Sequence, residues 1–384
     1  MNIELAAPAR LPATRLQQAA APFLFFLLGV MFATWASRIP AIRDALQINA
    51  GQLGIVLLCG GIGSVLSFPL ASVLIGHYGA RRAAAQTGGG LLLAVTCLPW
   101  MPNMAGLMVC MTAMGAAASS FDVAINAIGA EMEKNARRST MSLLHAWFCV
   151  GSLSGALFGS AMAAFAVAPQ LHFVLASAAL ALPLWYACRA LPHDRPDPSL
   201  GKRSFALPHG ALIVVGIIGF CGAIAEGSIA DWSGVFMKDH LQVADGVAPL
   251  GYAAFAGMML ASRLLGDRLK DRYGARRVVA VSASIAACGV FGAVLAPNVV
   301  LAVTGFAIAG AGIATVFPFV FSAAGRHGPS ALAAVATMGY SGGLIGPPII
   351  GFVAHHFGMA MGLTFVGVLN VAVALAALNA RALE

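Results

Sequence analysis

Twelve apolar runs, each long enough to cross a lipid bilayer as a helix, constrain the fold of this chain more than any other feature. Spanning a hydrocarbon core of about 30 Å takes roughly 20 mostly apolar residues in a helix. Only 9% of the 384 residues are charged, whereas a soluble globular chain carries roughly 25%. The sequence therefore predicts an all-α membrane protein with twelve transmembrane helices. The predicted helices cover residues 18–40, 52–75, 83–101, 104–131, 140–166, 171–190, 209–231, 248–265, 278–296, 299–323, 332–354 and 360–380.

The net charge of +8 comes from short clusters of Lys and Arg between the apolar runs. If the N-terminus is cytoplasmic, the cytoplasmic loops carry Arg81, Arg82, Lys134, Arg137, Arg138, Arg195, Lys202, Arg203, Arg268, Lys270, Arg272, Arg276, Arg277 and Arg326. The opposite side holds only Arg38, Arg43 and Lys238. Cytoplasmic loops of membrane proteins carry such an excess of positive charge. The sequence therefore predicts a multi-pass protein of the inner membrane with both termini in the cytoplasm, and the basic charge needs no nucleic acid to explain it.

The chain repeats itself after 195 residues, without a gap, at several separate places. The matches are Ile42 to Ile48 with Met237 to Val243, Tyr78 to Arg82 with Tyr273 to Arg277, Pro102-Asn103 with Pro297-Asn298, Gly115 with Gly310, His145 with Tyr340, and Gly151 with Gly346. Because each copy holds an even number of spans, both copies have the same orientation across the membrane. The repeat predicts two pseudo-symmetric six-helix bundles, 1–190 and 209–384, joined by a cytoplasmic linker at 191–208.

Two repeated loops with the sequence Tyr-Gly-Ala-Arg-Arg resemble the signature loop of the major facilitator superfamily, whose pattern is roughly G-x-x-x-D-R-x-G-x-R-R. In the second loop the matching positions, with the upstream acid, are Asp267, Asp271, Arg272, Gly274, Arg276 and Arg277. The first loop keeps Gly79, Arg81 and Arg82, but has Gly76 and His77 where the signature has an aspartate and a basic residue. Glycine permits the tight turn, and arginines hold the loop at the anionic lipid surface. The resemblance implies a gating role for these loops; the alternative is a simple basic turn.

The resemblance covers nearly the whole chain and becomes narrower in four stretches: ATWASRIP (33–40), DVAINA (122–127), EGSIADW (226–232) and GYSGGLIGPP (339–348). These stretches are similar to a bacterial branch of MosC-like membrane proteins, which is near sugar:proton symporters. The resemblance implies the two-bundle fold of the superfamily and a sugar-like or polyol-like solute.

Ionisable residues inside a membrane span are costly and usually face a cavity or a partner. Asp122 shares one helical face with Ser119 and Asn126. His145 and its repeat mate Tyr340 lie at a similar depth, which allows a contact between Asp122 and His145. A histidine near a carboxylate can titrate around neutral pH. The alternative for His145 is an ordinary hydrogen bond between helices.

A second polar group lies where the first and seventh predicted helices end. The first of these helices carries Trp35 and Arg38, and the seventh carries Glu226, Asp231 and Trp232. The resemblance to the major facilitator superfamily implies that the periplasmic ends of these two helices approach each other when the transporter faces inward. We therefore expect Arg38 to pair with Asp231 or Glu226 as a latch on the periplasmic side. The alternative is that the charges are solvated anchors and the tryptophans belong to the aromatic belt of the interface.

Carboxylates and indoles suit hydroxyl-rich solutes, because carboxylates accept hydrogen bonds and indoles stack on sugar rings. The expected substrate-binding residues are Trp35, Asp122, Asn126, His145, Glu226, Trp232 and Tyr340. Asp122 and Glu226 are the expected proton-coupling residues, since a lone buried carboxylate tends to bind a proton. Glu131 and Glu133, near Arg137 and Arg138, are either further gating contacts or a solvated charge cluster.

The sequence lacks a Walker A loop, because no Lys is followed by Ser or Thr, and it lacks HExxH and spaced Cys/His sets. We therefore expect no enzyme, no metal and no cofactor. The predicted function is proton-coupled secondary transport, a symport by alternating access, by a monomer in the lipid bilayer. Efflux of drugs or metabolites by proton antiport, and a non-transporting receptor, stay open as alternatives. The direction of transport and the solute are not decided by the sequence.

Overall fold

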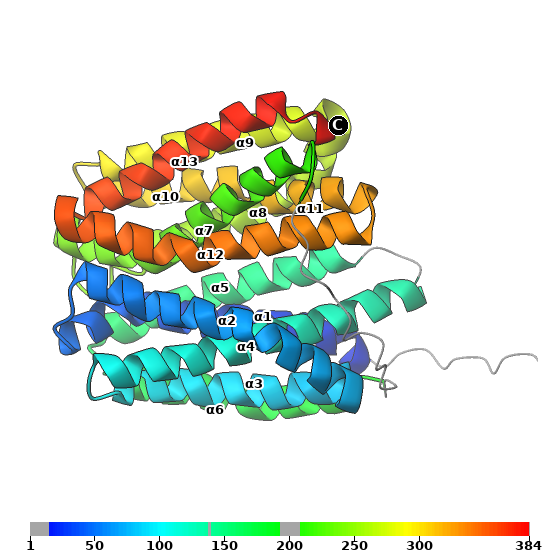
Figure 1. Ribbon diagram of the computed structural model, residues 1–384. Coiled ribbons are helices and arrows are strands. Elements are labelled where there is room, and N and C mark those ends of the chain that lie inside the picture. Colours follow the sequence, from blue (N-terminus) through cyan, green and yellow to red (C-terminus); the bar gives the residue numbers. More distant parts are fainter. Residues whose placement is uncertain (1–14, 137–139, 193–207, 384) are drawn as a thin grey trace, which may run out of the picture.

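The computed structural model describes residues 15–136, 140–192 and 208–383, and within these ranges the regular structure is entirely helical (Figure 1). The first half contains α1 (Arg15–Ala45), α2 (Ala50–Tyr78), α3 (Ala80–Cys97), η1 (Leu98–Trp100), α4 (Met104–Ala136), α5 (Met141–Ala164) and α6 (Pro169–Ala190). The second half contains α7 (Leu212–Leu241), α8 (Leu250–Tyr273), α9 (Ala275–Val294), α10 (Val299–Ile313), α11 (Val316–Arg326), α12 (Pro329–Phe357), α13 (Met359–Asn379) and η3 (Arg381–Leu383).

The twelve predicted spans are confirmed, with the tenth built from two helices, α10 and α11. The break falls at Ala314 and Thr315. Pro318 lies four residues after Ala314, and a proline ring clashes with the carbonyl group four residues earlier and removes one helical hydrogen bond. In the described part of the chain, nine spans are long and apolar enough to cross a membrane by length and composition alone.

The first and seventh helices run further than the sequence indicated. Helix α1 continues through Pro40 to Ala45, and α7 continues to Leu241 instead of ending at residue 231. Both helices end on the same side of the molecule, which we call the distal end. The opposite side, where α6 and α13 end and the C-terminus lies, is called the linker end and is at the right of Figure 1.

The helices form two bundles that lie one above the other in Figure 1, with α1 to α6 below and α7 to α13 above. Contacts between the bundles are concentrated on three helix pairs: α2 with α12, α5 with α8, and α1 with α7. These pairs are the seams along which the halves can move relative to each other.

The two bundles repeat the same packing contacts at positions 195 residues apart. Gly115 on α4 packs against the carbonyl group of Gly60 on α2, and Gly310 on α10 packs against the carbonyl group of Phe255 on α8. At both glycines a Cβ atom would collide with that carbonyl oxygen. Small residues let helix backbones approach this closely in a membrane. The repeat in the sequence is therefore also a repeat in the packing.

The turns of the signature loops also match. Gly79 and Gly274, each between two helices, have φ of 82° and 79°. A side chain is strongly disfavoured at such positive φ values, so glycine is required at both turns.

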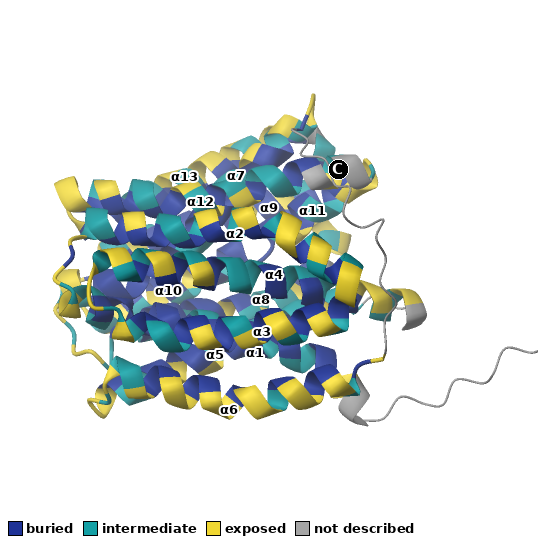
Figure 2. Cartoon of the chain, turned by 60° about the horizontal axis from the view of Figure 1, so that its bottom comes forward, coloured by how far each residue is buried: buried dark blue, intermediate teal, exposed yellow. Residues whose placement is uncertain are grey.

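The outer faces of the bundles carry large apolar side chains, as lipid contact requires. Figure 2 shows many exposed positions along α6, among which Leu171, Leu175, Leu182 and Trp185 follow one side of the helix. In water such a stripe would be an association site, whereas in a bilayer it faces lipid tails.

Candidate functional site

An ion pair joins two helices of the second bundle, α7 and α8, near the middle of each helix. Arg263 on α8 and Glu226 on α7 approach to 3.6 Å between Nη2 and Oε1. The Nη1 group of Arg263 also donates to the Sγ atom of Cys149, 3.0 Å away on α5. Because α5 belongs to the first bundle, the Arg263 side chain bridges the two halves.

This ion pair is incompletely satisfied. Nothing in the described part of the protein accepts a hydrogen bond from Nε of Arg263 or donates one to Oε2 of Glu226, although both atoms are buried. A guanidinium group has five N–H donors, and a thiol is only a weak acceptor. Leaving such groups unpaired inside a protein is costly. The arrangement therefore has unused binding capacity for a polar ligand.

His145 lies one helical turn before Cys149 on α5, within electrostatic range of Arg263. Its ring packs edge-on against Phe25, with centroids 5.2 Å apart. The contact between His145 and Asp122 that the sequence allowed is not formed among the described residues. We call Arg263, Glu226, Cys149 and His145 the Arg263 cluster.

Asp122 is held by its own helix. The Nδ2 group of Asn126, one turn later on α4, donates to Oδ1 of Asp122 and to its backbone oxygen, each at 2.9 Å. The predicted shared face of these two residues is therefore confirmed. Asp122 also lies within electrostatic range of Tyr340 on α12, in the other half.

Tyr340 packs near Phe68 on α2, with their ring centroids 5.6 Å apart across the seam between the halves. We call the Arg263 cluster and this aromatic pair the two walls of the candidate site. Half of the Tyr340 surface is exposed. Further along the same seam, towards the distal end, Gly54 lies so close to the backbone of Pro347 and Pro348 that a Cβ atom would be only 3.1–3.2 Å from it. The seam is thus tight at the distal end and looser near Tyr340.

The two walls occupy equivalent places in the repeat. A shift of 195 residues places Phe68 on Arg263, and His145 on Tyr340. The α2–α12 seam is therefore aromatic where the α5–α8 seam is charged. Sequence reasoning missed Arg263, although a lone arginine inside the predicted span 248–265 was the signal that could have found it.

Trp35 and Trp232 are packed inside the protein instead of lining an open surface. Their exposed fractions are 1% and 0%, and neither indole N–H finds an acceptor among the described residues. In this conformation neither ring can stack on a solute, so their predicted role in binding would require a rearrangement.

At the distal end the halves are joined by two reciprocal ion pairs. Arg43 on α1 binds Asp239 on α7 in a bidentate manner, at 2.5 Å and 2.7 Å. Lys238 on α7 binds Asp44 on α1 at 2.8 Å. Arg43-Asp44 and Lys238-Asp239 are repeat mates, so each half supplies one cation and one anion. We call these four residues the distal clasp.

Other contacts strengthen the same end. Lys238 also pairs with Asp245, 2.7 Å away and within its own half. Ser160 on α5 donates to the carbonyl oxygen of Gly246 at 2.5 Å. The cavity beneath these contacts, lined by Ser37, Arg38 and Asp245, has a volume of about 10 Å³, which is room for about one water molecule. A solute cannot pass here.

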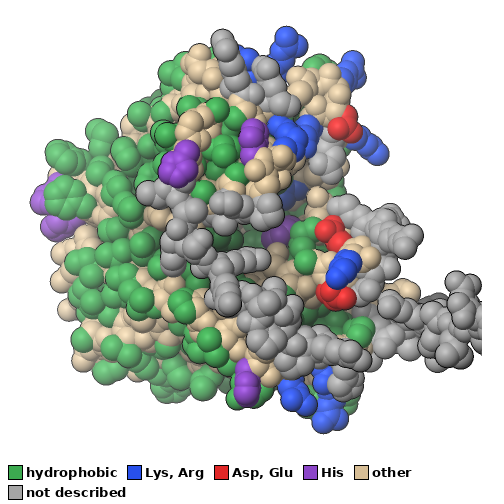
Figure 3. Space-filling view, turned by 45° about the vertical axis from the view of Figure 1, so that its right-hand side comes forward, with side chains coloured by type: hydrophobic (Ala, Val, Ile, Leu, Met, Phe, Trp, Pro, Cys, Tyr) green, Lys and Arg blue, Asp and Glu red, His purple; other side chains and the backbone are tan. Residues whose placement is uncertain are grey.

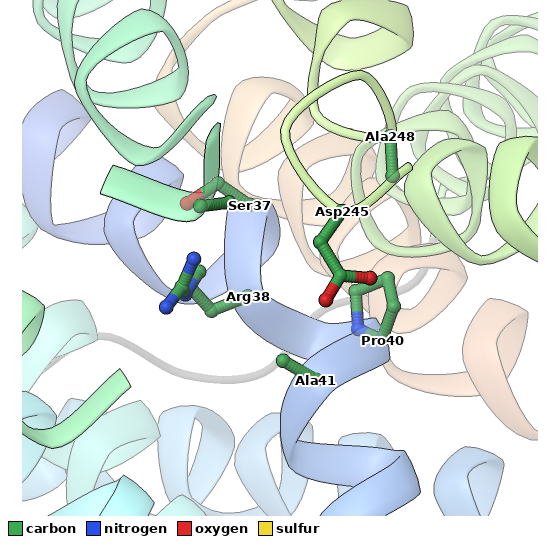
Figure 4. Close-up of a pocket in the computed structure, with 7 residues that line it drawn as sticks. Ser37, Arg38, Pro40, Ala41, Asp245 and Ala248 are labelled. Atoms are coloured by element: carbon green, nitrogen blue, oxygen red, sulfur yellow. The ribbon is translucent and has the colours of Figure 1, made fainter. Parts of the chain in front are cut away.

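The predicted pairing of Arg38 with Asp231 or Glu226 was wrong for this conformation. Arg38 donates through Nη2 to the carbonyl oxygen of Val167, and Figure 4 shows its guanidinium group directed away from the Asp245 carboxylate. Glu226 pairs with Arg263 instead. Because α1 and α7 extend beyond their predicted ends, Asp231 is buried ten residues before the end of α7, and the residues that meet are those of the distal clasp.

The signature loops lie at the linker end, where Figure 3 shows Lys and Arg side chains on the rim. Arg276 donates to the carbonyl oxygen of Leu378, and Lys270 donates to Ser322 Oγ at 2.9 Å. Both contacts stay within the second half. Arg272 lies over the ring of Tyr273 and Asp271 is exposed. Their predicted gating role remains a prediction.

Several other predicted gating residues occupy the same end. Arg81 is the second residue of α3, two residues after Gly79. Glu133 accepts hydrogen bonds from the backbone N–H groups of Thr140 and Met141, at 2.6 Å and 2.9 Å, and so caps the start of α5. Arg137, Arg138 and the side chain of Asp267 lie outside the described residues. Within the described ranges no cluster of His, Cys, Asp and Glu has the arrangement of a metal site.

Comparison with known proteins identifies relatives over nearly the whole chain. A sequence profile of the Major Facilitator Superfamily matches residues 21–347. Membrane protein MosC of Rhizobium meliloti is 33% identical over 373 residues, which cover 95% of this chain and 90% of that protein.

Two solved transporter structures have the same fold. The nucleoside transporter NupG has a TM-score of 0.72 at 16% identity, over 96% of this chain and 99% of that one. A D-xylose-proton symporter has a TM-score of 0.74 at 14% identity, over 94% of this chain and 97% of that one.

Proposed function

Since the chain belongs to the Major Facilitator Superfamily, we propose that it is a secondary active transporter of a small sugar-like or polyol-like solute. Transport proceeds by alternating access and is coupled to protons as a symport. One observation carries the proposal. An incompletely satisfied polar site lies between two similar halves, and ion pairs between those halves close one end. A carrier needs both features, because its site must open to one side at a time.

The charges support one orientation. The basic residues of the signature loops lie at the linker end, which favours a cytoplasmic location for this end and both termini and a periplasmic location for the distal end. The conformation described above is then closed towards the periplasm. The halves that rock are 1–190 and 209–384, with 191–208 as the linker, in a monomer of the inner membrane.

The solute binds between the two walls. Tyr340 and Phe68 offer aromatic faces for a sugar or polyol ring, and the Asp122 carboxylate, steadied by Asn126, accepts hydrogen bonds from hydroxyl groups. NupG and the D-xylose-proton symporter, which share the fold, carry nucleosides and a sugar by their names. Both kinds of solute are rich in hydroxyl groups.

Protons couple through Asp122 and Glu226. Both carboxylates lie within membrane-spanning helices. The cation partner of Glu226 is 3.6 Å away, beyond hydrogen-bonding distance, and its Oε2 atom has no hydrogen-bond partner among the described residues. Protonation of Glu226 would weaken its ion pair with Arg263. Arg263 also donates a hydrogen bond to Cys149, which belongs to the first bundle. A proton can thereby change how the two halves are held together.

The test is counterflow in proteoliposomes loaded with unlabelled sugars and polyols, with external labelled solute. Saturable exchange without a gradient identifies a carrier, and accumulation driven by an inward proton gradient identifies symport. Exchange of cationic amphiphiles alone would support proton antiport of drugs instead. Ligand binding without any exchange would support a receptor and would refute transport.

A further inference from the structure

The Arg263 guanidinium group has fewer strong hydrogen-bond acceptors around it than a cation inside a membrane normally has. Its closest carboxylate oxygen is 3.6 Å away, beyond hydrogen-bonding distance. Its best hydrogen bond goes to a thiol, and its buried Nε finds no acceptor in the described part of the chain. An arginine at such a place is costly and normally pairs fully. The unsatisfied guanidinium group indicates that the solute supplies the missing acceptor.

We propose that Arg263 binds an acidic group of the solute, so that the transported class is a hydroxylated monocarboxylate, such as a sugar acid. This inference rests on the proposed transport function and narrows its substrate class. A carboxylate offers two oxygens in the geometry that the guanidinium fork matches. The side chain is only 16% exposed, so little water competes for it.

The aromatic wall formed by Phe68 and Tyr340 offers no partner for a second acidic group of the solute. The repeat mate of Arg263 is Phe68, so the equivalent place in the other seam holds an aromatic ring. Asp122, within electrostatic range of Tyr340, would repel a second carboxylate and accept a hydrogen bond from a hydroxyl group instead. The site therefore fits a solute with a carboxylate at one end and a hydroxylated ring or chain at the other.

Binding of the solute is linked to proton uptake by Glu226. The solute carboxylate and Glu226 compete for the same guanidinium group, and Glu226 loses its only cation partner among the described residues when the solute enters. A proton from the open side then forms an O–H bond on Glu226, and no bond of the solute changes. One anion and one proton enter together, so the net charge of the site is unchanged. Such linkage is reciprocal: each ligand strengthens binding of the other.

Two matched sets of sugars test the charge requirement on the purified full-length protein. The sets are galacturonate, galactose and galactosamine, and glucuronate, glucose and glucosamine. The acid of at least one set should raise the melting temperature, because a ligand that binds the folded state stabilises it. Its neutral and amino counterparts should bind at least about tenfold more weakly, since a hydrogen-bonded charge pair is lost.

Variants connect the effect to the site. Arg263→Gln should weaken binding of the acid by at least about tenfold, and Arg263→Lys by less, because Lys keeps the charge but lacks the fork. Arg189→Gln is the matched control, since Arg189 lies on α6 over the Trp185 ring, away from the site. In Glu226→Gln the affinity for the acid should no longer depend on pH, whereas in the unchanged protein it should rise by up to about tenfold per unit of falling pH.

The outcomes separate the inference from the transport proposal. Counterflow of galactose or glucose that is as strong as that of the acids, or acid binding unchanged in Arg263→Gln, would overturn the inference and leave transport standing. Preference for the amino sugars would do the same. Absence of counterflow with all six compounds would refute both the inference and the sugar-like solute class.

Discussion

The distal clasp allows a quantitative prediction about opening of the distal end, which is the periplasmic side in the proposed orientation. Replacing Asp44 and Asp239 together by asparagine keeps the shape of both side chains and removes both ion pairs between the halves. The closed distal end should become less stable, and the protein should open towards the periplasm more often.

The size of the effect follows from the exposure of the pairs. Asp44 and Asp239 are 41% and 36% exposed, so water screens them. Partly exposed ion pairs contribute about 0.2–1 kcal/mol each, and a bidentate pair lies near the upper end. Loss of two pairs then costs at most about 2 kcal/mol, a factor of up to roughly 30 in the gating equilibrium. If the open state held about 1% of the molecules before, it would hold up to about 23% afterwards.

A cysteine at Ala248 reports the opening, because this residue is 2% exposed and lies beneath the clasp. In spheroplasts, with the native cysteines replaced, a membrane-impermeant maleimide should label Ala248→Cys up to about twenty times faster in the double variant, provided opening is fast relative to labelling. High salt should reduce the difference between the variants, since it screens exposed charges.

Asp245→Asn is the matched control. Asp245 pairs with the same Lys238, but within one half, so both ion pairs between the halves survive its loss. Labelling as fast in Asp245→Asn as in the double variant, or no acceleration in the double variant, would refute the idea that the clasp holds the gate.

Two further predictions concern coupling and packing. Asp122→Asn and Glu226→Gln should each abolish accumulation driven by a proton gradient, because neither side chain can then carry a proton; unchanged accumulation in transport assays would remove them from the coupling mechanism. Gly310→Ala should lower the melting temperature, because overpacking against the Phe255 carbonyl costs about 1–3 kcal/mol. Gly292→Ala on α9 has open space and should raise it slightly, since alanine favours helix by about 1 kcal/mol; a similar change in both variants would contradict the packing analysis.

Much of the fold was predictable because a bilayer restricts which segments can cross it, and this restriction can be read along the sequence. Every span must be apolar over about 20 residues, and the backbone must satisfy its hydrogen bonds within a helix. The run lengths and the repeat of 195 residues thus determined twelve spans in two similar bundles. The requirement for glycine at Gly79 and Gly274 was also visible, because a tight turn leaves few other choices.

The candidate site was predictable only within single helices. Asn126 donates to Asp122 because residues four apart in a helix share a face. This relation follows from the spacing in the sequence alone. The partner of Glu226 lies 37 residues later on another helix, and no periodicity relates the two positions. Only the packing of α7 against α8 in the tertiary structure therefore identifies Arg263 as part of the site.

The sequence alone determined which residues are repeat mates, including the two charged pairs that form the distal clasp. Only the tertiary structure decided that these mates face each other and that Arg38 does not meet Asp231. The reason is geometric: each added helical residue advances the chain by about 1.5 Å and turns it by about 100°. The additional helical residues, up to Ala45 on α1 and Leu241 on α7, therefore exchange one set of facing side chains for another.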